Sequence, residues 1–210
     1  MIKSAGLSSN ISSVLGRIFA FLPFHPNTIT VFSVFFAVAG FVFSYFGSLY
    51  YAFFSFVLAF FFDVLDGAVA RIKKLATKKG AFLDGVSDRI VEFFLIISLM
   101  FFTLPAILFP SWLWLVSILF FGSCMTSFVK AYAHHKEILI KEEAEKLGGF
   151  LERGERGILL LLSFLLTILD YSSYAALLLI IVSVLSFATF AYRFWAVVKN
   201  IKHLNVSVDK

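Results

Sequence analysis

Long apolar stretches dominate this 210-residue chain and limit the folds that it can adopt. A helix needs about 20 predominantly apolar residues to cross the hydrocarbon core of a bilayer. The stretches of that kind cover residues 28–47, 50–72, 82–103, 110–133, 157–171 and 173–198. With 60% hydrophobic residues and 29 Phe, the chain is too apolar for a soluble domain of this size. The sequence therefore predicts an all-α membrane protein with a six-span bundle over residues 28–198.

The first 22 residues have a different pattern, which predicts an amphipathic juxtamembrane helix. Apolar residues recur there at helical spacing, opposite Ser and Asn: Leu7, Ile11, Val14, Leu15 and Ile18. Lys3 and Arg17 add cations suited to a helix that lies on a membrane surface. This segment lacks the compact apolar core and cleavage site of a signal peptide. No internal repeat or linker interrupts the chain, so we expect one domain over residues 1–210.

The basic residues predict the orientation of the spans. Lys and Arg are concentrated at the N-terminus, in residues 71–79, in residues 130–156 and in residues 193–210. The alternate connections, around residues 47–48, 105–111 and 170, contain none. Because Lys and Arg favour cytoplasmic loops, we expect a cell-membrane protein with both termini on the cytoplasmic side. The net charge of +5 is divided among separate loops, which argues against nucleic-acid binding.

Four aspartates stand out, because charged groups within a membrane span are costly and usually functional. Asp63 and Asp66 lie near the end of the second stretch, and Asp84 and Asp88 lie near the start of the third. Spacings of three and four residues place each pair on one face of its helix. The short basic segment between the two stretches would fold one helix back against the other. We therefore expect all four carboxylates to meet near the cytoplasmic boundary.

Carboxylates gathered in this way require neutralising cations. Carboxylate oxygens suit Mg²⁺, Mn²⁺ or Ca²⁺, and two such ions can assist displacement at phosphorus. Gly67, Ala70, Gly80 and Gly85 keep the adjoining surface free of bulk, and Arg71 adds a cation suited to a diphosphate. One alternative is a buried ion-pair network with Arg71 and Arg89, although two arginines cannot balance four aspartates. Another is an ion-conducting or ion-carrying protein, which does not explain the arginine and the glycines.

The same residues resemble the signature of the CDP-alcohol phosphotransferase family, which is D-x-x-D-G-x-x-A-R, eight residues, then G-x-x-x-D-x-x-x-D. The chain matches each fixed position of it: Asp63, Asp66, Gly67, Ala70, Arg71, Gly80, Asp84 and Asp88. Members of this family have six spans, a juxtamembrane helix and cytoplasmic termini, and they are commonly homodimers. The resemblance implies an enzyme of phospholipid biosynthesis that transfers a substituted phosphate from CDP-diacylglycerol or CDP-archaeol to an alcohol and releases CMP.

The resemblance also implies roles for individual residues. Asp63, Asp66 and Asp84 would be ligands of two Mg²⁺ or Mn²⁺ ions. Asp88 would approach the metal and act as general base toward the acceptor hydroxyl. The CDP group would be bound by Asp66, Gly67, Ala70, Arg71 and Gly80. Pro26, Asn27 and Thr30 are similar to the P-N-x-x-T entry to the family's first span, although such residues also begin helices in general.

The acceptor alcohol has to be inferred from cations outside the signature. The candidates for binding an acceptor phosphate are Lys130, Arg153, Arg156 and Arg193. Residues 149–156 are similar to the G-x-x-E-R-x-x-R of members that use inositol phosphate. Those members usually continue after the lysine as A-R-A-E, whereas this chain has Ala131-Tyr132-Ala133-His134. The resemblance therefore favours inositol phosphate and leaves glycerol phosphate as the nearest alternative.

Overall fold

The computed structural model describes residues 25–75 and 77–208, with the side chains of 201–208 excepted. Within these residues it consists of helices and loops, with no strand longer than an isolated bridge at Ile107 and Phe109. The all-α prediction is therefore confirmed. The predicted juxtamembrane helix over 1–22 lies outside the described residues. The chain forms two compact units, Met1–Phe101 and Phe102–Lys210, and the single domain predicted over 1–210 stays a prediction.

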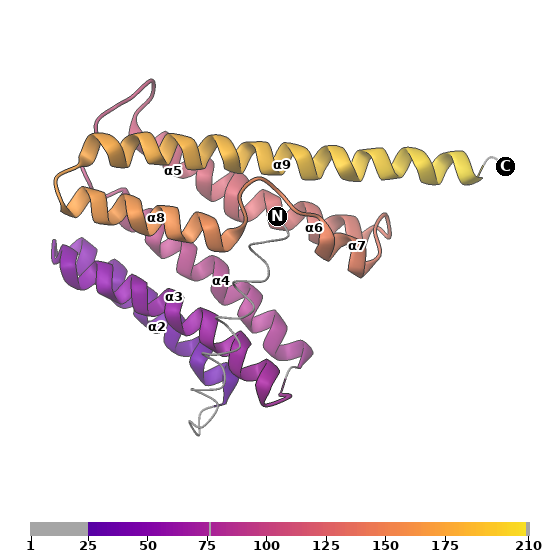
Figure 1. Ribbon diagram of the computed structural model, residues 1–210, viewed down its shortest axis with the longest axis horizontal. Helices are drawn as coiled ribbons and strands as arrows, with labels where there is room; N and C mark the ends of the chain where they lie inside the picture. Colours follow the sequence, from indigo (N-terminus) through magenta and orange to yellow (C-terminus); the bar gives the residue numbers. More distant parts are fainter. Residues whose placement is uncertain (1–24, 76, 209–210) are drawn as a thin grey trace. The chain divides into compact units, whose positions relative to one another are not determined.

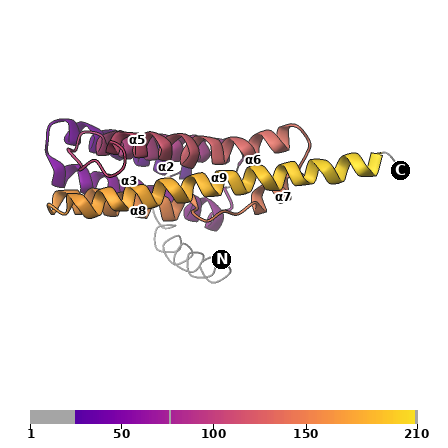
Figure 2. The same ribbon diagram turned by 90° about the horizontal axis from the view of Figure 1, so that it is seen from above.

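From residue 25 onward, the described part of unit 1 contains three helices. They are α2 (Pro26–Tyr45), α3 (Leu49–Ile72) and α4 (Lys78–Leu99). A short turn with Gly47 at φ 73° joins α2 to α3, which lie side by side in Figures 1 and 2. The buried face of α2 is made mostly of small residues, including Ser33, Ala37 and Gly40. Small residues let helix backbones approach closely, which is how helices associate in lipid.

The ends of these helices fix the turn that joins α3 to α4. The helix α3 ends at Ile72, and Lys74 adopts a positive φ of 53°. Thr77 then caps α4, because its hydroxyl accepts a hydrogen bond of 3.0 Å from the backbone N–H of Gly80. Such a cap starts α4 directly after the turn, so the acidic residues of α3 and α4 lie near one end of unit 1.

Unit 2 is built around one long helix. The helical segments are α5 (Ser111–Ser117), a π-helix η1 (Ile118–Met125), α6 (Thr126–His135), α7 (Lys141–Lys146), α8 (Arg153–Ile168) and α9 (Ser172–Val208). The segments α5, η1 and α6 follow one another without a break, and α9 packs against these three and against α8. In Figures 1 and 2 the C-terminal part of α9 extends beyond the end of α8.

Helices occupy all six predicted span positions, but four of them are long and apolar enough to cross a membrane by themselves. These four are Pro26–Tyr45, Leu49–Ile72, Ser111–His135 and Ser172–Asn200. The helix α4 carries several charged residues, among them Asp84, Asp88 and the buried Glu92. The helix α8 has 16 residues, which at about 1.5 Å each give about 24 Å, short of a 30 Å bilayer core. The described residues thus support an integral membrane protein with four candidate spans.

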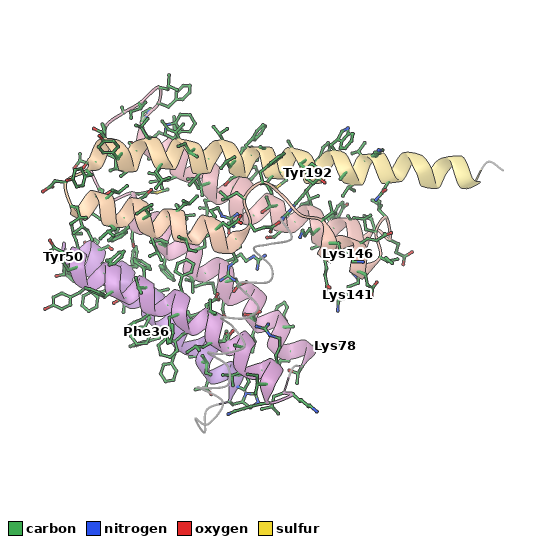
Figure 3. The ribbon with its side chains drawn as sticks, viewed as in Figure 1. Phe36, Tyr50, Lys78, Lys141, Lys146 and Tyr192 are labelled. Carbon is green, nitrogen blue, oxygen red and sulfur yellow. The ribbon has the colours of Figure 1, made fainter. Side chains whose placement is uncertain are left out.

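Several predicted details differ in the structure. The last stretch, expected at 173–198, belongs to a helix that continues to Val208. The fourth stretch contains a π-helix, which apolar periodicity does not reveal. Residues 134 and 135 end α6, and the polar residues 136–149 form the short α7 and its flanking loops, with an i,i+4 ion pair between Lys141 and Glu145 at 3.8 Å. Figure 3 shows Lys141 and Lys146 extending from this segment.

Close packing of α2 on α3 generates a stability prediction. A Cβ atom at Gly40 would lie 2.9 Å from the ring of Phe56, which is fully buried. Gly40→Ala should therefore lower the melting temperature in detergent, since overpacking of this kind costs about 1–3 kcal/mol. Gly154→Ala is the matched control, because nothing lies within 4 Å of its added Cβ. Thermal unfolding should rank Gly40→Ala well below Gly154→Ala, and equal melting temperatures would contradict the packing argument.

Candidate metal and nucleotide site

Three of the four predicted aspartates form a cluster that could hold a metal ion. Asp63 on α3 and Asp84 and Asp88 on α4 each offer a carboxylate oxygen, and these oxygens lie within 4.8 Å of one another. Asp88 is buried, while Asp63 and Asp84 are partly exposed. Carboxylates at this separation repel one another unless a cation neutralises them. The residues present therefore fit a hard divalent cation such as Mg²⁺ or Mn²⁺.

Asp66 is held separately, one helical turn from Asp63. It is 3% exposed, and its Oδ2 accepts a hydrogen bond of 2.5 Å from the hydroxyl of Thr30 on α2. The other carboxylate oxygen, Oδ1, is buried and has no hydrogen-bond partner among the described residues. A buried acceptor without a partner is costly. The geometry thus leaves one oxygen of Asp66 available to a cation or to a ligand with a donor group.

A pocket in unit 1 adjoins these acids. It is lined by Pro26, Asn27, Thr30, Asp66, Gly67, Ala70, Arg71, Leu75, Thr77, Gly80, Ala81 and Asp84. All five residues expected to bind CDP are in this lining. Asp84 belongs both to the pocket and to the carboxylate cluster, so a ligand in the pocket would lie beside the candidate metal site.

Small residues keep this pocket open. A Cβ atom at Gly80 would lie 3.2 Å from the hydroxyl oxygen of Thr77 and 3.3 Å from the amide oxygen of Asn27. A side chain at this position would therefore press on two polar groups of the lining. Gly67 has a similar place on α3, where an added Cβ would lie 3.5 Å from Nη1 of Arg71. The two glycines thus bring backbone to the surface of the pocket, where a flat polar ligand can approach closely.

A cation stands directly beside Asp88 on α4. The Nη1 atom of Arg89 lies 3.3 Å from Oδ2 of Asp88 and also donates to the backbone oxygen of Gly85 at 2.8 Å. The short link between adjacent residues orients one oxygen of Asp88. It adds a single cation beside a cluster of three carboxylates.

The four predicted acceptor cations belong to unit 2. Arg156 and Arg193 are buried, with 4% and 5% exposure. Arg193 donates to the carboxylate of Glu152, which is the residue before Arg153. Lys130, on α6, reaches the backbone oxygen of Glu145 at 3.5 Å. The first turn of α8 thus has three arginines around it, namely Arg153, Arg156 and Arg193. Arg193 also donates to the carbonyl oxygen of Thr126, which lies one helical turn before Lys130 on α6.

Sequence reasoning did not identify the contact between Thr30 and Asp66. The P-N-x-x-T resemblance pointed to the right segment, but a helix start explained the same residues. In the structure both interpretations apply, because Pro26 is the first residue of α2 and His25 caps the helix through a hydrogen bond from Asn27 N–H. Thr77 was also missed as a pocket residue, since its sequence signal is that of an ordinary helix cap.

Comparison with known proteins identifies the family. The model of the CDP-alcohol phosphatidyltransferase family matches residues 24–188, most of the chain. An uncharacterized protein of Aquifex aeolicus (strain VF5) is 34% identical over 145 residues, which are 69% of this chain and 70% of that protein.

Solved structures of a phosphatidylinositol phosphate synthase (PgsA1) from Mycobacterium tuberculosis have a similar fold. The structure with CDP-DAG bound has a TM-score of 0.65 and 26% identity, and covers 90% of this chain and 94% of that one. The complex with manganese and citrate has a TM-score of 0.70 and 23% identity, and covers 89% and 88%. These likenesses extend across both units of the chain.

The apolar helices indicate an integral membrane protein, and the matched family consists of enzymes that transfer substituted phosphate groups. The chain belongs to the CDP-alcohol phosphatidyltransferase family. Membership of a transferase family favours an enzyme over the ion-conducting alternative and associates the chain with phospholipid biosynthesis.

The hydrogen bond between Thr30 and Asp66 generates a prediction on activity. Thr30→Val removes the hydroxyl but keeps the shape of the side chain, so Asp66 loses the donor that orients it. A hydrogen bond to a charged group contributes about 1.5–3 kcal/mol, so CMP release from a CDP-lipid should slow by roughly tenfold or more. Thr30→Ser retains the hydroxyl and should keep most of the rate. If Val and Ser give equal rates, the hydroxyl has no part in the site.

Proposed function

We propose that this enzyme transfers the phosphatidyl or archaetidyl group of a CDP-lipid to the hydroxyl of inositol phosphate and releases CMP. The observation that carries the proposal is Asp84, which joins the carboxylate cluster to the pocket. Phosphoryl transfer requires a bound diphosphate and a cation site side by side. The acceptor oxygen would form a bond to the lipid-bearing phosphorus while the bond from that phosphorus to CMP breaks.

The pocket residues would hold the donor. Arg71 supplies a fixed positive charge for the diphosphate, and Gly67, Ala70 and Gly80 leave room for the cytidine beside the backbone. The bound CDP-DAG of the Mycobacterium tuberculosis enzyme supports a CDP-lipid as donor. Ester and ether lipids carry the same CDP headgroup, so both CDP-diacylglycerol and CDP-archaeol fit this proposal.

The divalent metal would be Mg²⁺ or Mn²⁺, and we expect two ions. Their ligands would be the carboxylates of Asp63, Asp66, Asp84 and Asp88. When bound, such ions withdraw charge from the phosphoryl oxygens and stabilise the departing CMP. Support comes from the cluster of three carboxylates, the partnerless Oδ1 of Asp66 and the manganese of a protein with a similar fold.

Asp88 would be the general base. An alcohol is a weak nucleophile at neutral pH, and a carboxylate that accepts its proton assists the attack. The contact from Arg89 to Oδ2 orients the Asp88 side chain. The carboxylate would take up the proton of the acceptor hydroxyl as the new bond to phosphorus forms.

The basic residues of unit 2 support a phosphorylated acceptor. Four cations are available to bind an acceptor, namely Lys130, Arg153, Arg156 and Arg193. An acceptor without a phosphate, such as serine, would not require so many positive charges for its binding. The phosphatidylinositol phosphate synthase of Mycobacterium tuberculosis, 26% identical in one of its structures, favours inositol phosphate among such acceptors. Glycerol phosphate carries the same phosphate on a smaller polyol and is the second candidate.

The topology completes the proposal. We infer six spans, in which α4 and α8 cross the cell membrane in addition to the four apolar helices, and a homodimer as in other family members. Figure 3 shows Tyr50 and Lys78 at opposite ends of unit 1. A basic end favours the cytoplasmic side, so the active site would face the cytoplasm, where a soluble acceptor and CMP can exchange.

An assay of CMP release tests the proposed reaction. The purified protein in detergent should release CMP from CDP-diacylglycerol or CDP-archaeol faster with inositol phosphate than with glycerol phosphate, serine or free inositol. Chelation by EDTA should abolish release, and Mn²⁺ or Mg²⁺ should restore it. Release with serine but with neither phosphate would refute the acceptor. Full activity in EDTA would refute the metal.

Replacement of the base gives a separate test. Asp88→Asn should slow turnover by about 10²–10⁴-fold, because the amide cannot accept the proton. Binding of the CDP-lipid, measured by calorimetry in detergent with Mn²⁺ present, should change little, since Asp88 does not line the donor pocket. Arg89→Gln is the control for the neighbouring charge and should lose much less activity. A nearly normal rate for Asp88→Asn would exclude its role as base.

A further inference from the structure

The loop that precedes α5, residues 104–110, is exposed and carries no charge. Its sequence is Leu-Pro-Ala-Ile-Leu-Phe-Pro, and the chain between Glu92 and Lys130 contains no Asp, Glu, Lys, Arg or His. Leu108 is nevertheless 83% exposed, and Phe109 is 55% exposed. Large apolar side chains exposed side by side mark a surface that contacts another molecule or a membrane.

The backbone at the tip of this loop is unusual for a leucine. Leu108 has a φ of 62°, in the left-handed region that is costly for a residue with a Cβ atom. In a turn that faces water, Gly or Asn usually occupies such a position. The other non-glycine residues with a positive φ in the described chain are polar, namely Lys74, Glu137 and Asp170. A leucine in this conformation indicates that its apolar side chain has a role of its own.

Side chains of α5 hold the loop in shape. The hydroxyl of Ser111 donates to the backbone oxygen of Pro105 at 3.0 Å, and the indole N–H of Trp114 donates to that of Ile107 at 3.3 Å. The ring of Phe109 packs edge-on against Trp114, with the centroids 5.6 Å apart. The prolines of the loop have no N–H that needs a partner. Bonds of this kind reduce the cost of placing a loop in hydrocarbon, where water cannot satisfy the backbone.

The register of α9 gives the depth of the loop within unit 2. Ser183 on α9 donates to the hydroxyl of Ser117 at 2.9 Å, and Arg193 farther along α9 donates to the carbonyl of Thr126 at 3.0 Å. The helix α9 and the continuous α5–η1–α6 segment therefore run in the same direction. At a rise of about 1.5 Å per residue, the first residue of α9 lies about 7 Å farther out along the axis than the first residue of α5.

Polar and aromatic residues mark the membrane boundary at this end. Asp170 is exposed in the turn just before α9, and a charge of this kind belongs outside the hydrocarbon. Tyr171 and Tyr174 are 55% and 64% exposed, as in an interfacial aromatic belt. The loop joins α5 on the membrane side of these residues. In Figure 1 it extends sideways from the helices of unit 2 and not onward along their axes.

The length of the uncharged helix agrees with this depth. Residues 111–129 precede Lys130, and they rise about 27 Å at about 1.5 Å each, close to the 30 Å of a bilayer core. With Lys130 at one boundary, the start of α5 reaches the opposite boundary. A loop that leaves sideways from this point enters the apolar part of that leaflet.

We propose that the 104–110 loop is a membrane wedge, in which Leu108 and Phe109 insert among the acyl chains of the leaflet opposite Lys130. The loop continues the exposed apolar surface of a candidate span, where Trp112 and Val116 of α5 are 55% and 44% exposed. Acyl chains fit a surface that offers no charge. The wedge would fix the depth of α5 in the bilayer, and it depends neither on the acceptor nor on the reaction.

Spin labels measure what covers the loop. Cys124 is the one cysteine of the chain, so Cys124→Ser provides a background for single labels. Leu108→Cys places a label on the wedge, Val116→Cys places one on α5 as the lipid control, and Glu142→Cys places one on the charged α7 as the water control. In nanodiscs of phosphatidylcholine and phosphatidylglycerol, oxygen dissolves in the acyl chains and a nickel chelate stays in water. The ratio of oxygen to nickel collisions should be several-fold higher at 108 than at 142 and similar to that at 116.

Two results of the labelling overturn the proposal. If the nickel chelate reaches the label at 108 as readily as that at 142, the loop lies in water. If both reagents are excluded at 108 and dipolar coupling between labels disappears on dilution with unlabelled protein, a second copy of the chain covers the loop in place of lipid.

A substitution at the tip tests the wedge by stability. Asn suits the positive φ of Leu108, so Leu108→Asn would raise the melting temperature if the loop were in water. Among acyl chains the same change replaces an apolar side chain with an amide, and the melting temperature in nanodiscs should fall by a few degrees. Glu137→Asn is the matched control, because Glu137 is exposed at a φ of 57° in the charged 136–149 segment and should not lose stability. A melting temperature of Leu108→Asn at or above that of the unchanged protein overturns the proposal.

Discussion

The cost of carboxylates in an apolar setting is the constraint on which the rest of this structure depends. Two helices bring Asp63, Asp84 and Asp88 within a few ångströms of one another, while Asp66 is held apart by the hydroxyl of Thr30. Such an arrangement is stable only if cations or hydrogen-bond donors compensate it. The adjoining pocket, lined in part by Arg71 and by small residues, leaves space for a ligand beside these acids.

Much of this could be predicted from the sequence, because the relevant signals are local. Apolar length identified the helical segments, and the spacing of the aspartates indicated which helix faces would meet. The residues expected to bind CDP do line one pocket with Asp84. The division of roles among the acids could not be predicted in this way. Asp63 and Asp66 look equivalent in sequence, yet Asp63 joins the cluster and Asp66 bonds to Thr30, which lies 36 residues away in the chain.

Other features escaped prediction because they depend on tertiary packing. The π-helix leaves no trace in apolar periodicity, and α8 proved shorter than a standard span. The basic residues of unit 2 looked interchangeable in sequence. In the structure Arg193 bonds to a carboxylate and two carbonyls, whereas Lys130 reaches a single carbonyl at 3.5 Å. Charge alone could not distinguish these environments, because the partners come from segments more than 40 residues away from Arg193.

The π-helix between α5 and α6 has a consequence for how this family can diverge. In a regular α-helix, each residue turns the chain by about 100°, so an inserted residue rotates everything that follows. A π segment absorbs such an insertion within one or two turns. The side chains before Ile118 and those after Met125 can therefore face different directions, although both groups belong to one continuous helical segment. Lipid contacts on the first half and polar contacts on the second can then change independently during evolution.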